Sequence, residues 1–149
     1  MVRPKPLDAA LMASPEDTEQ QFYEALQRGD LDALMSVWSD DDDIVCVHPG
    51  GPRVLGPAAI RASFAAMFSV GAIDARPEKI RRVTMQTVAV HSVLERVQMT
   101  DEKGLHEAWV VATNVYVKTA QGWRLVTHHA SPGTPREMVD VGEPASTLH

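Results

Sequence analysis

The stretch Gly122-Trp123-Arg124-Leu125-Val126-Thr127-His128-His129-Ala130-Ser131 determines how the rest of the sequence is interpreted. It predicts one long strand near the end of the chain, which begins at a glycine turn and stops before Pro132. Side chains alternate between the two faces of a strand, so His128 and His129 cannot serve one site from the same side. One face is predicted to carry Arg124, Val126, His128 and Ala130, and the other Trp123, Leu125, Thr127, His129 and Ser131.

The segments before this strand predict an α+β fold. Strands are expected at about residues 79–87, 89–100 and 105–118, separated by turns that end in glycine. Residues 44–48 and 53–56 predict a short hairpin around Pro49-Gly50-Gly51-Pro52. Helices are expected to begin at Pro15, after Asp30 and at Pro57, where capping residues and prolines suit a first turn. This order indicates one curved antiparallel sheet with helices on one side.

Composition narrows the function classes. The chain has 149 residues, a net charge of -6 and one cysteine, Cys46. The negative charge gives no support to binding of nucleic acid or anionic membranes, and a single cysteine cannot form a disulfide within the chain. Without an apolar N-terminal segment or a membrane-spanning run, a cytoplasmic location is expected. The spacing of histidines and acidic residues matches no metal motif, so neither a metal nor a cofactor is predicted.

Several short pieces, taken in order, resemble a known superfamily. They are Gly29-Asp30-Leu31-Asp32, the Asp-rich turn at 40–43, Val47-His48-Pro49, Gly56-Pro57-Ala58-Ala59-Ile60 and Gly122-Trp123-Arg124. Their spacing resembles the cone-shaped nuclear transport factor two superfamily, in its SnoaL-like and ketosteroid-isomerase-like branch. The ending at residues 128–133 is also similar to the association domain of calcium/calmodulin-dependent protein kinase type II. The resemblance implies a cystatin-like cone at residues 14–133, in which a curved antiparallel sheet wraps over three N-terminal helices. The residues outside it show no periodic pattern, so a flexible arm is expected at 1–13 and a flexible tail at 134–149.

The resemblance also implies a pocket between the helices and the concave face of the sheet, and dimers that pair through the convex face. The general base of the isomerases, an Asp before a Pro, corresponds to His48. The acid of their oxyanion site corresponds to Asn114, and the Tyr beside it to Phe22. In the kinase association domain, basic pocket residues correspond to Asn114, Glu95 and Ala130. Neither set of polar residues is retained as a whole.

Strand parity gives a second view of the pocket. If Asn114 faces inward, Ala108, Val110, Ala112 and Tyr116 face inward as well. Trp109 is then expected on the outer face, together with Trp123 and Leu125. An outer face that apolar would need cover, which favours a homodimer burying the convex face of the sheet.

The predicted function is a small-molecule pocket protein, with cofactor-independent isomerase, dehydratase or cyclase chemistry as the leading hypothesis. His48 is the expected general base or acid, with Asn114 and His128 orienting a ligand oxygen. The ligand is expected to be a small apolar or carboxylate-bearing molecule. The alternatives left open are a non-catalytic ligand-binding or assembly module, a scaffold with a vestigial pocket, and a purely structural role for each named side chain. The predicted pocket wall consists of Phe22, Trp38, Phe64, Phe68, Glu95, Val110, Ala112 and Tyr116.

Overall fold

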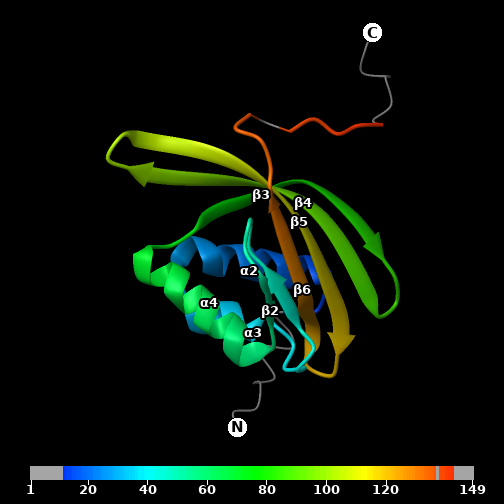
Figure 1. The fold of residues 1–149 in the computed structure, drawn as a ribbon. Helices are drawn as coiled ribbons and strands as arrows, with labels where there is room; N and C mark the ends of the chain where they lie inside the picture. Colours follow the sequence, from blue (N-terminus) through cyan, green and yellow to red (C-terminus); the bar gives the residue numbers. More distant parts are fainter. Residues whose placement is uncertain (1–11, 137, 143–149) are drawn as a thin grey trace.

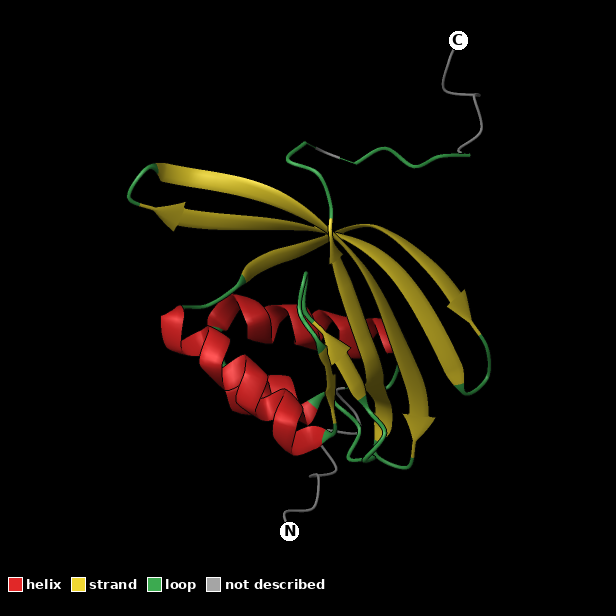
Figure 2. Cartoon of the chain, in the orientation of Figure 1, coloured by secondary structure: helices red, strands yellow, loops and turns green. Residues whose placement is uncertain are grey.

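The computed structural model describes residues 12–136 and 138–142. Figures 1 and 2 show its three described helices on one side of a curved six-stranded sheet. The helices are α2 (Pro15–Arg28), α3 (Leu31–Ser36) and α4 (Pro57–Val70). The strands are β1 (Val45–Val47), β2 (Arg53–Leu55), β3 (Asp74–Thr84), β4 (Val88–Asp101), β5 (Gly104–Thr119) and β6 (Gly122–Pro132), in the spatial order β2-β1-β6-β5-β4-β3.

The first two helices begin where the sequence predicts, and their caps explain why. The Ser14 hydroxyl accepts a hydrogen bond from the Asp17 amide at 3.1 Å, and the carboxylate of Asp30 accepts one from the Ala33 amide at 3.0 Å. Gly29 ends α2 in the left-handed conformation, at φ 65°. Two of the three helices precede the sheet, whereas α4 follows the β1–β2 hairpin, so the expectation of three N-terminal helices is met only approximately.

The sequence predicted a purely antiparallel sheet, but the observed sheet contains one parallel pair of strands. Strands β3 to β6 form an antiparallel meander, but β1 lies parallel to β6, with Cys46 opposite His128. The parallel approach begins earlier in the chain, at a bridge between Trp38 and Leu125. The meander sets the direction of β6, and the chain leaving α3 runs alongside it in the same direction. The pairing of Cys46 with His128 places β1, the first strand in the chain, directly beside β6, the last.

A bulge in β6 overturns one part of the predicted strand phase. Val115 pairs with Thr127 and Tyr116 pairs with Leu125, which leaves Val126 as an extra residue. One extra residue exchanges the two faces, so Leu125 and Trp123 point into the core, where they are 0% and 7% exposed. Their predicted outward orientation was wrong. His128 lies beyond the bulge, opposite Asn114, and both are buried.

Trp109 does lie on the opposite face from the core, but it is not exposed. The chain after Pro132 stays beside β5, since the Gly133 amide donates to the Trp109 carbonyl at 2.8 Å. It then reaches β3, where Arg81 lies 3.8 Å from Asp140. Because β5 and β4 separate β6 from β3, this segment must cross them, and Figure 1 shows it passing on the side away from the helices. With Trp109 and Trp123 both buried in one chain, the tryptophan argument for a dimer no longer applies.

Gly133 makes this crossing possible, which gives a test. A Cβ at Gly133 would lie 2.5 Å from the Trp109 carbonyl oxygen and 2.7 Å from Sδ of Met138. Gly133→Ala is therefore expected to lower the free energy of unfolding by about 1–3 kcal/mol, as overpacking does. Chemical denaturation measures the change. Gly71→Ala is the matched control, because a Cβ there meets nothing within 4 Å; equal effects of the two substitutions would contradict the close packing.

Residues 1–11, 137 and 143–149 lie outside the described part, and with them most of the predicted arm and part of the predicted tail. Met12, the first described residue, is buried, and its carbonyl accepts a hydrogen bond from the Trp123 amide at 2.8 Å. Within the described residues, no helix is long and apolar enough to cross a membrane.

Candidate functional site

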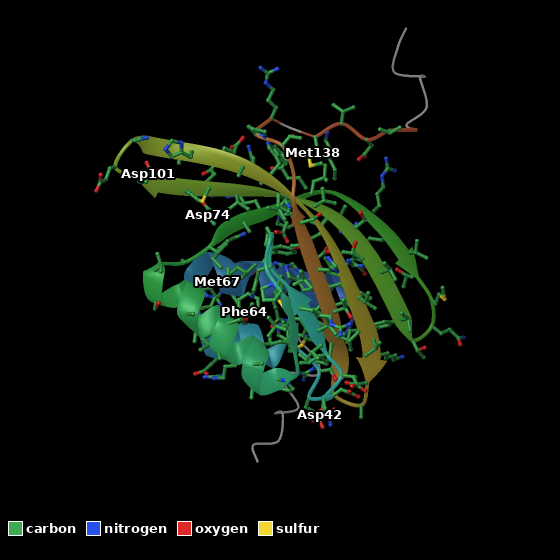
Figure 3. The ribbon with its side chains drawn as sticks, in the orientation of Figure 1. Asp42, Phe64, Met67, Asp74, Asp101 and Met138 are labelled. Atoms are coloured by element: carbon green, nitrogen blue, oxygen red, sulfur yellow. The ribbon has the colours of Figure 1, made fainter. Side chains whose placement is uncertain are left out.

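A cavity of about 1210 Å³ lies between α4 and the concave face of the sheet, and it extends toward the tip of the β4–β5 hairpin. Figure 3 labels Phe64 and Met67 on α4, Asp74 at the start of β3 and Asp101 at the hairpin tip. All four side chains line the cavity. Most of the remaining wall is apolar, and it includes Leu26, Ile73, Val97, Met99, Leu105, Ala108 and Val110. The size and the apolar lining suit a small organic molecule.

Three titratable side chains line the inner part of this cavity. They are Glu95 on β4, His128 on β6 and His48, which directly follows β1. Glu95 and His128 are both 5% exposed, whereas His48 is half-buried. Antiparallel pairing through β5 and the parallel β1–β6 contact bring these three distant positions to one concave surface.

A buried chain of hydrogen bonds joins Glu95 to His128. The Tyr23 hydroxyl donates to Oε2 of Glu95 at 2.7 Å and accepts from Nδ2 of Asn114 at 3.0 Å. Oδ1 of Asn114 lies 2.5 Å from Nδ1 of His128. An amide oxygen only accepts, so Nδ1 of His128 carries the proton and Nε2 keeps its lone pair. The chain thus determines the tautomer of His128.

Burial shifts the two ends of this chain in opposite directions. Desolvation raises the pKa of Glu95 to about 7, against the smaller lowering effect of the Tyr23 hydrogen bond. Desolvation lowers the pKa of His128 to about 3, with a further contribution from the charges of His48 and His129. At neutral pH, His128 is therefore neutral, and Glu95 is close to half-protonated.

His48 has a different set of partners. Its Nε2 lies 3.0 Å from the Ser63 hydroxyl, and its ring meets Phe64 edge-on with centroids 4.9 Å apart. Ser63 has one hydroxyl proton and donates it to the Ile60 carbonyl at 2.8 Å. Nε2 of His48 is then the donor to Ser63, which leaves Nδ1 as a proton acceptor. Desolvation lowers the pKa of His48, so the imidazole is neutral at pH 7.

The predicted site residues divide into two groups. His48, His128, Phe64, Glu95 and Val110 line the cavity. The others are buried or half-buried beside it without lining it. Phe22 packs against Tyr23, Phe64 and His128, and Phe68 packs against Phe64. Those outside the lining are Phe22, Trp38, Phe68, Ala112, Asn114 and Tyr116.

Asn114 and Tyr23 have different positions from those that the sequence predicted: Asn114 does not line the cavity, and Tyr23, which was not predicted, belongs to the hydrogen-bonded chain. Asn114 is fully buried, and both ends of its amide bond to other side chains, so it orients His128 instead of meeting a ligand. Tyr23 was missed because the resemblance assigned the tyrosine position to Phe22, its neighbour. A signal was available: α2 buries both residues, and a buried tyrosine hydroxyl requires a polar partner such as Glu95.

The chain can be tested through the hydroxyl of Tyr23. Tyr23→Phe removes the hydrogen bond that lowers the pKa of Glu95, so this pKa is expected to rise above about 7. Carboxyl ¹³C NMR across a pH titration measures it. Tyr116→Phe is the matched control, because it removes a second buried hydroxyl that makes no hydrogen bond to Glu95 and is not among the causes of its raised pKa. An unchanged Glu95 titration in Tyr23→Phe would contradict the chain.

No group of three or more His, Cys, Asp or Glu side chains within 12–136 and 138–142 is arranged to hold a metal ion. Cys46 is fully buried, and desolvation raises its pKa to about 12, so it is present as a thiol. The chemistry that this arrangement can perform is proton transfer between a ligand and a carboxyl or imidazole group.

Comparison with known proteins identifies the family to which this fold belongs. Residues 16–135 match the family described as the SnoaL-like domain. This chain belongs to the SnoaL-like family. A search of the curated proteins found no match to this SnoaL-like domain.

Solved structures similar to this SnoaL-like domain differ in their assigned roles. A proposed calcium/calmodulin-dependent protein kinase type II association domain from Thiobacillus denitrificans is 34% identical, over 83% of this chain and 98% of that one, with a TM-score of 0.75. A proposed dehydratase of the NTF2-like family from Streptomyces avermitilis is 28% identical, over 87% and 99%, with a TM-score of 0.72. An NTF2-like protein with a cystatin-like fold from Novosphingobium aromaticivorans is 17% identical, over 85% and 82%, with a TM-score of 0.66, which supports the fold alone.

Proposed function

We propose that this SnoaL-like domain is a cofactor-independent enzyme that moves protons on a small, mostly apolar molecule, by dehydration or isomerisation. The observation that carries the proposal is the presence of Glu95, His48 and His128 in one largely apolar cavity. A carboxyl group with a pKa near 7 beside neutral imidazoles is the arrangement that general acid–base catalysis needs at neutral pH. Similarity to a proposed dehydratase adds to this support.

In the proposed dehydration, Nδ1 of His48 takes the proton on the carbon next to a carbonyl group. The electron pair of that C–H bond forms the new double bond as the C–O bond to the departing hydroxyl breaks. Protonated Glu95 gives its proton to the departing hydroxyl, which leaves as water. Protons exchanged with solvent restore neutral His48 and protonated Glu95. His128, held in one tautomer by Asn114, orients the hydroxyl group.

The test uses a panel of β-hydroxy ketones with apolar chains in D₂O. We expect loss of water and deuterium incorporation beside the carbonyl, followed by NMR. His48→Gln and Glu95→Gln should each lower the rate by about 100-fold or more, the usual contribution of an acid or base. Glu102→Gln, an exposed change in the β4–β5 turn, is the control. Turnover that survives both cavity substitutions would reject the assignment.

A second candidate is an assembly module, because the 34% identical relative is a proposed association domain. The proposed contact is an isologous dimer through the outer face of the sheet. Ser92, Thr113 and His129 are exposed and pair side by side across β4, β5 and β6, so they form a row on that face. Thr113→Glu would place two charges at the two-fold contact and should yield monomers in sedimentation analysis, whereas Glu102→Arg should not. A dimer unaffected by Thr113→Glu, or a monomeric wild type, would reject this interface.

A further inference from the structure

The polar atoms at the inner end of the cavity share one property: each can accept a hydrogen bond, and none is left to donate one while Glu95 is ionised. We propose that the ligand of this cavity is an apolar alcohol or amine, which enters with its hydroxyl or ammonium group toward Glu95 and His128, and that carboxylates are excluded. This inference rests on the proposed function, since it names the class of molecule for that same site.

Glu95 supplies the first acceptor. Tyr23 donates to Oε2, and none of the described side chains donates a hydrogen bond to Oε1. Glu95 nevertheless lines the cavity, so Oε1 is the oxygen that a ligand can reach. A carboxylate accepts through both oxygens, and an ammonium or hydroxyl donor at Oε1 would complete its bonding. A ligand carboxylate at the same place would instead set two negative charges against each other inside an apolar wall.

His128 supplies the second acceptor. The direction of the hydrogen bonds from Glu95 through Tyr23 and Asn114 determines which nitrogen of His128 accepts. Ionised Glu95 can only accept, so Tyr23 must donate to it. The oxygen of Tyr23 is then free only to accept from Nδ2 of Asn114, which turns Oδ1 of Asn114 toward His128. His128 donates through Nδ1, and only the lone pair of Nε2 remains for a ligand. The tautomer of His128 is thus imposed from Glu95, three hydrogen bonds away.

His48 supplies the third acceptor through Nδ1, because its Nε2 donates to Ser63. The donor side chains of the lining lie elsewhere. Gln98, Thr100, Lys103 and His106 all belong to the β4–β5 hairpin, at the open end of the cavity. That end also carries Asp74 and Asp101, so charge at the entrance does not favour an anion either. The apolar walls between the two ends suit a hydrocarbon body with one donor group at its inner end.

A set of four probes with the same naphthalene ring system tests the proposal: naphthalen-1-ylmethanol, naphthalen-1-ylmethylamine, 1-naphthoate and naphthalene. Binding to the full chain is measured by isothermal titration calorimetry at about pH 8.5, where Glu95 is ionised. We expect the amine and the alcohol to bind at least about tenfold more tightly than naphthalene, and 1-naphthoate to bind more weakly than naphthalene. Glu95→Gln should weaken the amine by about tenfold or more and should strengthen 1-naphthoate, while Glu102→Gln should change neither.

A cavity-blocking variant locates the binding. Ala108 lines the cavity between Glu95 and the entrance, so Ala108→Phe should abolish binding of the amine and the alcohol. Preference for 1-naphthoate, equal binding of all four probes, no binding by the amine and alcohol, or binding that persists in Ala108→Phe would each overturn the inference.

The two proposals fail separately. Tight amine and alcohol binding without any dehydration or deuterium exchange would remove the enzyme hypothesis and leave the ligand class standing. Glu95-dependent turnover in a protein that binds 1-naphthoate more tightly than the other probes would remove the ligand-class inference and leave the enzyme hypothesis standing.

Discussion

Glu95→Gln is expected to raise the free energy of unfolding by up to about 3 kcal/mol at about pH 8.5, while it slows the proposed dehydration by about 100-fold or more. The wild-type carboxyl group has a pKa of about 7 when folded, against 4.5 for an ordinary glutamate. The folded state therefore binds this proton more tightly than the unfolded chain, and wild-type stability falls as the pH rises from about 4.5 through about 7. Above that range the full cost of an ionised, buried carboxylate is present, and glutamine does not carry it.

Denaturant unfolding at several pH values measures this effect. The advantage of Glu95→Gln over wild type should be near zero at about pH 4, should grow between about pH 4.5 and 7, and should stay constant above. Glu102→Gln, on an exposed turn, should show no such pH-dependent gain. A Glu95→Gln protein that is destabilised equally at every pH would indicate that Glu95 contributes only as a hydrogen-bond partner of Tyr23.

His128→Phe is expected to show the opposite pH dependence. The folded pKa of His128 is about 3, against 6.5 for an ordinary histidine, because the imidazole is buried. The unfolded chain takes up the proton first, so wild-type stability falls as the pH drops from about 6.5 toward about 3. Between about pH 8 and pH 4, the burial of His128 should lower the free energy of unfolding of the wild type by about 3 kcal/mol, and His128→Phe should not show this decrease. It should also carry a pH-independent cost for the unpaired oxygen of Asn114.

The neighbour of His128 offers a matched control. His129 is exposed on the other face of β6, and its charge is a smaller cause of the lowered pKa of His128 than desolvation, so His129→Phe should change the pH dependence of stability much less than His128→Phe. Urea titrations at about pH 4 and pH 8 compare the three proteins. In the wild type, Glu95 and His128 act in opposite directions between about pH 4.5 and 6.5, so their combined effect there should be nearly flat. Identical pH profiles for His128→Phe and His129→Phe would contradict a buried neutral His128.

Local patterns in the sequence determined much of this protein. The caps at Ser14 and Asp30 and the glycine turns of the meander act within a few residues, so they could be predicted without the fold. The inward orientation of His128 and the outward orientation of Trp109 also follow from alternation along one strand. Family resemblance added the cone and the location of the pocket, and the SnoaL-like match confirms that membership.

Only the tertiary structure decided which groups meet and how they ionise. One bulged residue, Val126, reversed the phase of Trp123 and Leu125, and periodicity does not reveal such an insertion. Tyr23 contacts Glu95 and Asn114 across 72 and 91 residues, so no local pattern could pair them. The raised pKa of Glu95 comes chiefly from desolvation, which depends on what other segments place around a side chain. The sequence therefore determined the elements and most of their faces, whereas long-range packing decided the faces after the bulge and the chemistry at the inner end of the cavity.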